Sequence, residues 1–243
     1  MTRMPRFFCT DITDTTIRIT GGDAYHIARV LRMHPGEQLT VCDGLGTDYS
    51  TVIRSATAQE VHLEILERCP TLSEPTTQVT LYQGLPKSDK MDWIVQKTVE
   101  LGIARIVPVA MSRSISRTDA QKAEKKQERW QKIAAEAAGQ SGRGCIPIVS
   151  PPLSWRQMLA EIIPSQTLLF YEGGGRPLPD LVDSKTAELS IIVGPEGGFS
   201  EREVQELKEA GVTSATLGKR ILRCETAPVA ALAAIMCLSG NMT

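Results

Sequence analysis

The stretch IIVGPEGGFSEREV, residues 191–204, passes from an apolar run through a glycine-rich turn into a charged segment. Ser200 and Glu203 form the pattern of a capping box ahead of Val204 and Leu207, which predicts that a helix begins here. An apolar run that enters a helix through a tight turn is typical of a mostly parallel α/β sheet. We therefore expect this turn at the carboxyl end of a strand, where such sheets bind their ligands.

The chain from Gln78 onward repeats this alternation of strand and helix. Short apolar strands are expected at VTLYQGL (79–85), ARIVPVA (104–110), QTLLFYE (166–172), LSIIVG (189–194) and TSATLG (213–218). Helical spacing predicts helices over 88–102 and roughly 119–138. The last segment, TAPVAALAAIMCLSG (226–240), is apolar nearly all round, so it must be buried in a core or in a subunit interface. The pattern predicts an α/β fold with a mainly parallel, covered sheet.

The first 70 residues are mostly β. Strands are expected at TIRIT (16–20), QLTVCDG (38–44), YSTVIRSAT (49–57) and EVHLEILER (60–68), and this spacing predicts a small barrel. Asp23 is expected to cap one short helix, whose buried face would carry Ile27, Val30 and Leu31.

A stretch rich in Pro, Ser and Thr, residues 71–77, separates the two patterns and is interpreted as a linker. We therefore expect one domain over residues 1–70 and a second over residues 78–243. A chain of 243 residues is long enough for both.

Charge is unevenly distributed along the chain. The formal net charge is −1, which argues against a protein that coats nucleic acid non-specifically. Residues 105–143, however, hold nine Lys or Arg against four Asp or Glu, and such a local excess could contact RNA or DNA. A solvated helix face with i,i+4 ion pairs explains the same composition equally well.

The composition argues against a membrane protein and against a metal site. No run of about 18 apolar residues is present, and the N-terminus MTRMPRFFCTDITD lacks the pattern of a signal peptide. The six cysteines are scattered without a CxxC pair, and only three histidines accompany them. We expect reduced thiols in a cytoplasmic protein and no zinc site.

The turn GPEGG, residues 194–198, could cradle a phosphate, but its residues argue against one. A P-loop needs Lys and then Ser or Thr after its last glycine, whereas Phe199 follows here. A bound anion would also lie near Glu196, at a Coulomb cost of about 1 to 4 kcal/mol at roughly 4 Å. Glycines beside apolar strand ends would instead suit a flat ring and a cation, as in S-adenosylmethionine. An equal alternative is that the glycines only shape the turn.

Several spaced segments resemble one known family. They are HIARVLRMHPGEQL (26–39), KSDKMDWIVQKTVELGIARIVPV (87–109), QSGRGCIPIV (140–149), IVGPEGGFSEREV (192–204) and LGKRILRCETAPVAALAAI (217–235). In this order they are similar to the bacterial 16S ribosomal RNA uridine-N3 methyltransferases, the RsmE family of the SPOUT superfamily. The resemblance covers nearly the whole chain.

The resemblance implies an N-terminal PUA-like β-barrel and a C-terminal SPOUT α/β domain with a deep trefoil knot, which the strand and helix pattern does not reveal. It also implies a homodimer, with contact expected on the apolar C-terminal helix, and the cofactor S-adenosyl-L-methionine bound in the knot. The cofactor-binding residues carried over are Leu169, Phe170, Ile192, Gly194, Glu196, Gly197, Gly198, Leu217, Gly218, Ile221 and Leu222. Glu196 would either face the positive charge of the cofactor or pin the loop.

Two positions depart from the family pattern. Gly139 stands where a Glu is expected, which weakens any role for a carboxylate there. Cys224 stands where a Thr is expected, and a thiol cannot match the hydrogen bonding of a hydroxyl.

Methylation of uridine N3 requires removal of its proton or stabilisation of the resulting anion. Arg223 or Arg143 is the candidate for stabilising negative charge on the uracil carbonyls. Glu225 is the candidate general base, or the residue that orients an arginine. An ion pair between Arg223 and Glu225 that only holds the loop is an alternative.

Three arginines are candidates for contact with 16S rRNA. Arg29 and Arg32 lie i,i+3 apart in the predicted short helix and could grip phosphates, as could the forked guanidinium of Arg143. The alternatives are surface solubility for the first two and a helix C-terminal cap for Arg143. The expected substrate is 16S rRNA, within the small ribosomal subunit. Methylation of another RNA base or of a ribose hydroxyl, or RNA binding without catalysis, are the alternative functions.

Overall fold

The computed structural model describes residues 4–114 and 120–242, so residues 115–119 of the predicted basic segment and helix lie outside the described part of the chain. Two compact units make up the chain. The first contains Met1–Glu74 and Ala138–Ile146, and the second contains Pro75–Ala137 and Pro147–Thr243. The expected second domain includes Ala138–Ile146, but this segment makes its contacts within the first unit.

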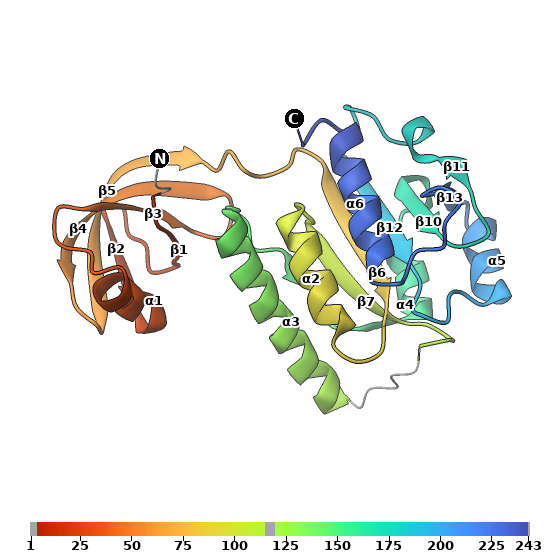
Figure 1. Cartoon of the computed structure of the whole chain (residues 1–243), viewed down its shortest axis with the longest axis horizontal. Coiled ribbons are helices and arrows are strands. Elements are labelled where there is room, and N and C mark those ends of the chain that lie inside the picture. The colour runs from red at the N-terminus through yellow and green to blue at the C-terminus, as the bar shows by residue number, and fades with distance from the viewer. Residues whose placement is uncertain (1–3, 115–119, 243) are drawn as a thin grey trace. The chain divides into compact units, whose positions relative to one another are not determined.

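The first unit is built on a five-stranded sheet with the order β1-β3-β4-β5-β2 (Figure 1). Its strands are β1 Arg6–Phe8, β2 Thr16–Thr20, β3 Gln38–Cys42, β4 Thr47–Ala56 and β5 Glu60–Pro70. Alternate side chains such as Ile17, Ile19 and Ile53 share one face and form the core. Register shifts after Ser50 and Ile53 bend the sheet. Because β1 and β2 are the two ends of the strand order, the sheet is a curled half-barrel and not a closed barrel.

The short helix of the first unit begins earlier than expected. It consists of α1, Gly21–Tyr25, followed by a single π-helical segment, His26–Val30. The prediction that Asp23 caps this helix is wrong, because Thr20 is the N-cap residue and Asp23 lies in the first turn.

The π-helical segment also changes which side chains face the core. Its wider turn breaks the 3.6-residue period, so Ile27 is buried, whereas Val30 and Leu31, which the period assigns to the same face, are exposed. Arg32 lies beyond the helix with a positive φ of 53°. Arg29 and Arg32 are both exposed, but they do not share a helix face as expected.

The second unit contains an eight-stranded parallel sheet with the order β11-β13-β10-β12-β6-β7-β8, and β9 also pairs with β7. The strands are β6 Gln78–Gly84, β7 Arg105–Ala110, β8 Ile148–Val149, β9 Leu153–Ser154, β10 Thr167–Phe170, β11 Arg176–Pro177, β12 Glu188–Val193 and β13 Thr213–Thr216. The predicted parallel sheet is confirmed. The strands missing from the prediction, β8, β9 and β11, are too short to leave a periodic signal.

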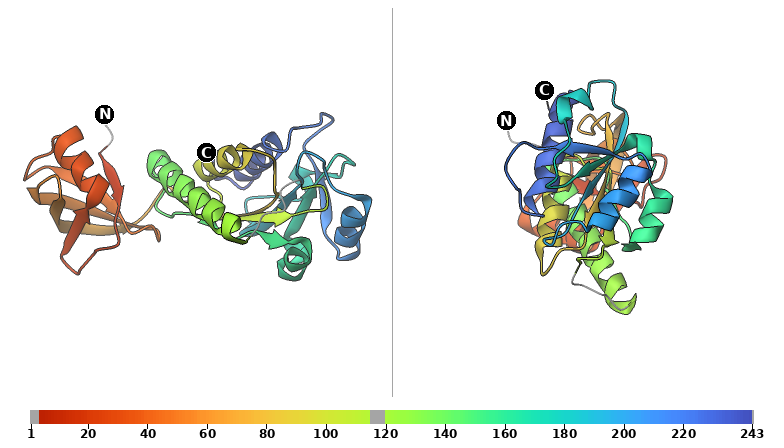
Figure 2. Two further views of the ribbon diagram at one scale, coloured as in Figure 1. Left: turned by 90° about the horizontal axis from the view of Figure 1, so that it is seen from below. Right: turned by 90° about the vertical axis from the view of Figure 1, so that its right-hand side faces the viewer.

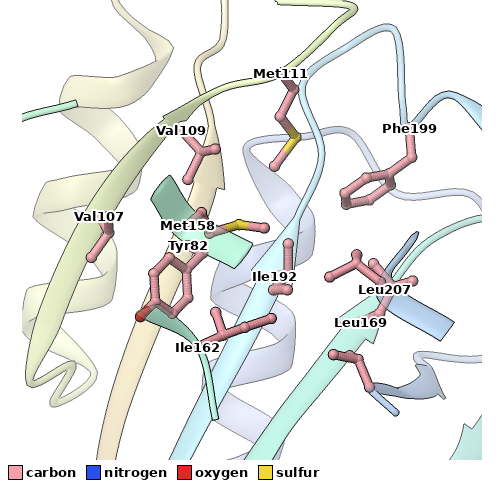
Figure 3. Close-up of a cluster of buried hydrophobic side chains, with 11 residues drawn as sticks. Tyr82, Val107, Val109, Met111, Met158, Ile162, Leu169, Ile192, Phe199 and Leu207 are labelled. Carbon is pink, nitrogen blue, oxygen red and sulfur yellow. The ribbon is translucent and has the colours of Figure 1, made fainter. Parts of the chain in front are cut away.

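Helices cover both faces of this sheet (Figures 1 and 2). They are α2 Lys90–Glu100 and α6 Thr226–Leu238 on one face, and α4 Trp155–Glu161 and α5 Glu201–Glu209 on the other, while α3 spans Ala120–Ser141. On the α4 and α5 face, Tyr82, Leu169 and Ile192 of the strands pack with Met158 of α4 and Leu207 of α5 (Figure 3). These side chains form the core between the sheet and the two helices.

Helix α6 is buried on one side. Its buried residues are Pro228, Ala231, Leu232, Ile235 and Met236, and it packs against α2, β6 and β12. Val229, Ala230 and Ala233 on its other side are only half-buried. Among the described residues, no helix combines the length and the apolar character needed to cross a membrane.

Three strand ends meet at one edge of the sheet. In the register of the sheet, Phe170 at the end of β10 pairs with Val193 of β12 and with Ala215 of β13. The predicted capping box at the start of α5 is confirmed: the Glu203 N–H donates to the Ser200 hydroxyl at 3.3 Å, and the Ser200 N–H donates to the Glu203 carboxylate at 2.8 Å. The cap fixes the point at which the GPEGG turn ends.

Candidate functional site

A cavity of about 1110 Å³ opens at the carboxyl ends of β10, β12 and β13. It is lined by Lys90, by residues 170–175, 193–199 and 215–225, and by Ala227. The carboxyl edge of an open parallel sheet is where α/β domains bind ligands, and the volume is that of a site for a small molecule or cofactor.

Most of the expected cofactor residues lie on the wall of this cavity. Those that line it are Phe170, Gly194, Glu196, Gly197, Gly198, Leu217, Gly218, Ile221 and Leu222. Leu169 and Ile192 do not line it, because both are fully buried in the core below the strand ends. Side chains alternate along a strand, so a residue next to a lining position faces away from the cavity.

Glycines bring the chain close together around the cavity. A Cβ on Gly194 would lie 3.0 Å from the Phe199 ring. Gly198 has a φ of +65°, and a Cβ there would lie 3.1 Å from a carboxylate oxygen of Glu172. Gly218, with a φ of +97°, faces open space. The GPEGG glycines therefore shape the turn and also leave room that side chains would fill.

An ammonium group connects two carboxylates at the wall of the cavity. Lys90 Nζ lies 3.1 Å from Glu196 Oε1 and 3.1 Å from Glu225 Oε2. The backbone N–H of Lys87 also donates to Glu196, at 3.1 Å. The Cys224 thiol donates to Glu225 Oε2 at 3.2 Å. Lys90 lies in the segment KSDKMDW that resembles the family, but no local pattern around it predicts this role.

These contacts shift the pKa values of the four groups. For Glu196 and Glu225, burial opposes ionisation, but hydrogen bonds from backbone N–H groups and from Lys90 outweigh it and lower both carboxyl pKa values. Hydrogen bonds to Glu196 and then to Glu225 raise the pKa of the Lys90 ammonium. Burial, together with the neighbouring Glu225, raises the pKa of the Cys224 thiol to about 12. The cluster therefore holds two carboxylates, one ammonium and a neutral thiol at neutral pH.

Arg223 lines the cavity and is exposed. In the described ranges 4–114 and 120–242, no carboxylate forms an ion pair with it, and Glu225 pairs with Lys90 instead. The alternative in which an Arg223–Glu225 ion pair holds the loop is therefore not what the structure contains.

Arg143 belongs to the first unit, and its guanidinium is buried. Its Nη2 donates to Glu74 Oε2 at 2.7 Å, and Glu74 Oε1 accepts the N–H groups of Gly144 and Cys145 at 2.8 and 3.0 Å. The structure places Arg143 in an ion pair inside the first unit. The guanidinium is therefore not an open phosphate-binding group. The helix-cap alternative is confirmed for the backbone, because the Arg143 N–H donates to the Ala138 carbonyl at 2.9 Å in the last turn of α3.

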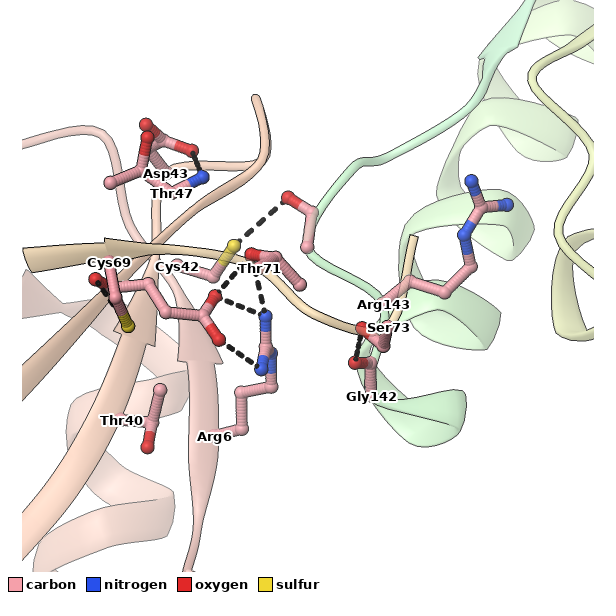
Figure 4. Close-up of polar contacts among 12 residues, drawn as sticks. Arg6, Thr40, Cys42, Asp43, Thr47, Cys69, Thr71, Ser73, Gly142 and Arg143 are labelled. Carbon is pink, nitrogen blue, oxygen red and sulfur yellow. Dashed lines mark hydrogen bonds and ion pairs between the residues drawn. The ribbon is translucent and has the colours of Figure 1, made fainter. Parts of the chain in front are cut away.

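Figure 4 shows further polar contacts within the first unit. Arg6 donates to Asp48 at 2.8 Å, and the Cys42 thiol donates to the Gly144 carbonyl at 2.9 Å. The Ser73 hydroxyl donates to the Gly142 carbonyl at 2.7 Å. Within the first unit, segment Ala138–Ile146 is therefore held by side-chain contacts to its backbone and by backbone hydrogen bonds, from the Gly46 N–H to the Gly144 carbonyl and from the Ile146 N–H to the Gly44 carbonyl, both at 3.1 Å.

Metal chemistry has no candidate site in the part of the chain that the structure describes. Within it, no group of three or more His, Cys, Asp or Glu side chains is placed to hold a metal ion. The cavity wall offers carboxylates, cations and glycines.

A glycine-lined cavity at the carboxyl edge of a parallel sheet defines a cofactor-binding α/β protein, here with an N-terminal half-barrel. The RNA methyltransferase domain family matches residues 73–236, and the RNA methyltransferase PUA domain family matches residues 19–66. The chain belongs to the ribosomal RNA small subunit methyltransferase E family of RNA methyltransferases.

Two kinds of relative support this assignment. Ribosomal RNA small subunit methyltransferase E of Bacillus subtilis is 38% identical over 228 residues, which cover 90% of this chain and 89% of that protein. The crystal structure of ribosomal RNA small subunit methyltransferase E from Neisseria gonorrhoeae bound to S-adenosyl methionine is 36% identical and covers 97% of this chain and 98% of that one, with a TM-score of 0.87. A putative methyltransferase from Legionella pneumophila in complex with the same cofactor is 28% identical, with 97% and 98% covered and a TM-score of 0.86.

Proposed function

We propose that the chain transfers the methyl group of S-adenosyl-L-methionine to N3 of one uridine in the 16S rRNA of the small ribosomal subunit. The observation that carries the proposal is the glycine-lined cavity at the carboxyl ends of β10, β12 and β13. It is supported by the name of the Bacillus subtilis relative and by the cofactor bound to the Neisseria gonorrhoeae relative. A ribosomal substrate would place the enzyme in the cytoplasm.

The residues of the cavity fit this cofactor better than they fit a phosphate ligand. Apolar side chains such as Phe170, Leu217 and Leu222 can contact a flat adenine. Glu172 and Glu196 bring negative charge, which suits a sulfonium and an ammonium group and opposes a phosphate. When bound, the cofactor supplies an electrophilic methyl group. We assign cofactor contact to the nine expected residues that line the cavity, and support of the wall to Leu169 and Ile192.

Arg223 is the residue that we assign to charge stabilisation on the uracil carbonyls. Its guanidinium is exposed at the cavity wall, and a donor aimed at developing negative charge is among the strongest single contributions to catalysis. Arg143 is left out of the catalytic and RNA-binding sets, because its guanidinium is buried against Glu74.

Glu225 is assigned to positioning and not to proton removal. An effective general base has a pKa close to the working pH. Burial opposes ionisation of Glu225, but hydrogen bonds from its backbone N–H, from Cys224 and from Lys90 outweigh burial and lower the pKa of this carboxyl group, away from neutral pH. We expect Glu225→Gln to reduce turnover less than tenfold, against the roughly 100- to 10,000-fold loss that removal of a general base brings. Single-turnover methylation with both substrates at saturation measures this, and a loss of 100-fold or more would restore the base role.

The wider architecture is proposed from the family. We assign a trefoil knot to the segments that carry the cavity, and a homodimer in which the half-buried side of α6 meets a second copy. A chain of 26.5 kDa would then have about twice that mass in light scattering. The domain over residues 1–70 would bind rRNA, with the exposed Arg29 and Arg32 contacting phosphates independently of each other.

The function is tested by mapping modified bases in 16S rRNA from a strain that lacks the chain. We expect one 3-methyluridine to disappear and to return when the purified chain and S-adenosyl-L-methionine are added to small subunits. If a methyl group were instead missing from another base or from a ribose, the chain would still be a methyltransferase, but its target would be that group and not uridine N3. If every methylation persists and calorimetry detects no cofactor binding, the proposal is wrong and RNA binding alone remains.

A further inference from the structure

Three separate segments of the second unit meet at the Lys90 ammonium. Lys90 is the first residue of α2, Glu196 lies in the GPEGG turn, and Glu225 is the N-cap residue of α6. Both carboxylates are 3.1 Å from the same nitrogen atom. The turn and the α6 start each form part of the cavity wall, so this one side chain joins two parts of that wall.

Each carboxylate is also tied at a second point. The Lys87 N–H donates to Glu196, and the Cys224 thiol donates to Glu225. The exposed fractions of the Lys90, Glu196 and Glu225 side chains are 33%, 27% and 19%. Water therefore screens the two ion pairs only in part. Without the ammonium, two ionised carboxylates would face each other across a gap that one nitrogen now fills, and they would repel.

We propose that Lys90 is a positioning residue that fixes the cofactor wall by holding Glu196 and Glu225 together. The role rests on the proposed function, since it concerns the same cavity. Lys90 keeps the GPEGG turn and the start of α6 at the separation that the cofactor needs, and it leaves the catalytic contact to Arg223. Lys90 and the Lys87 N–H hold Glu196 in place, so this residue pins the loop while it also lines the cavity.

The place of Lys90 between two carboxylates predicts that cofactor binding depends on pH in a way that a purely structural lysine would not cause. Burial opposes ionisation of Glu196 and Glu225, but hydrogen bonds from backbone N–H groups, from Lys90 and, for Glu225, from Cys224 lower both carboxyl pKa values. The intact arrangement is therefore present above those values and is lost as the pH falls through them. Removal of the ammonium raises the pKa of both groups, because their mutual repulsion is no longer offset. As the pH is lowered, the variant without the ammonium should therefore lose cofactor binding at a higher pH than the unchanged protein does.

The test is calorimetric binding of S-adenosyl-L-methionine to the full chain across a pH series. We expect Lys90→Gln to weaken binding about fivefold to tenfold at neutral pH and to move the acid limb of the binding profile to higher pH. Lys90→Arg should restore most of the affinity and the original profile. Lys97→Gln is the matched control, because Lys97 lies on the same helix and pairs with Glu100, at 2.8 Å, on that helix.

A double variant, Glu196→Gln with Glu225→Gln, removes the charges that Lys90 holds. In that background Lys90→Gln should change affinity less than twofold, and a full effect there would overturn the proposal. An unchanged affinity and profile in folded Lys90→Gln would overturn it too. Failure of the unchanged chain to bind the cofactor at all would instead refute the proposed function, so the two failures are distinguishable.

Discussion

Arg223→Gln is expected to lower kcat about 100- to 1000-fold and to leave the Kd for S-adenosyl-L-methionine within about twofold. The guanidinium is exposed at the cavity wall, so its removal leaves no buried charge behind and does not disturb the fold. What is lost is the donor for the negative charge that develops on the uracil ring as N3 loses its proton. Single-turnover methylation of small subunits measures the chemical step, and calorimetry measures the cofactor affinity.

Arg220→Gln provides the matched control, because Arg220 is an exposed arginine on the same loop and also lines the cavity. We expect it to raise KM for rRNA several-fold through weaker phosphate attraction, with kcat little changed. If Arg220→Gln produced the loss of kcat and Arg223→Gln did not, the assignment of the charge-stabilising role to Arg223 would be wrong.

Glu74→Gln is expected to destabilise the chain by about 3 to 5 kcal/mol. The side chains of Arg143 and Glu74 are only 6% and 17% exposed. The substitution leaves the buried Arg143 charge without its carboxylate, and it weakens the two backbone N–H contacts that Glu74 Oε1 accepts. Urea unfolding followed by circular dichroism measures the loss as a lower midpoint with an unchanged slope.

The same pair predicts the direction of acid destabilisation. Burial opposes ionisation of Glu74, but the hydrogen bond and charge of Arg143 outweigh it and lower the pKa of the carboxyl group. The stability that this pair contributes is therefore present above the pKa of an unfolded glutamate, about 4.3, and is lost as the pH falls through the lower folded value. Glu67→Gln on the exposed end of β5 is the control and should change stability by less than about 0.5 kcal/mol. An equal loss from both variants would contradict the proposed cause.

Local patterns in the sequence predicted much of this protein correctly. The strand and helix alternation after Gln78, the capping box of Ser200 and Glu203, and the position of the GPEGG turn all follow from residues within a few positions of one another. Such local patterns agree with the structure because they depend on backbone geometry and hydrogen bonding inside one element. The resemblance of ordered motifs to a family then supplied the cofactor and the target, which no local pattern contains.

Periodicity failed where the backbone departs from regular geometry. The π-helical segment His26–Val30 moved Val30 out of the core. Leu169 and Ile192, which the family resemblance assigned to the cofactor site, are buried behind the cavity wall because side chains alternate along a regular strand. Spacing in the sequence predicts the buried face of an element only if the residue period is known along the whole element. Both errors concern the face of the helix or strand on which a side chain lies.

The sequence by itself determined the parallel α/β sheet, the glycine-rich turn at a strand end and the family to which the chain belongs. Only the tertiary structure decided what the charged residues do. Glu196 and Glu225 share the Lys90 ammonium, and the buried guanidinium of Arg143 is paired with Glu74. These partners lie far apart along the chain, and charge pairing depends on distance in space, which has no period in the sequence. The GPEGG turn is thus a cavity wall whose central glutamate is held from outside its own segment.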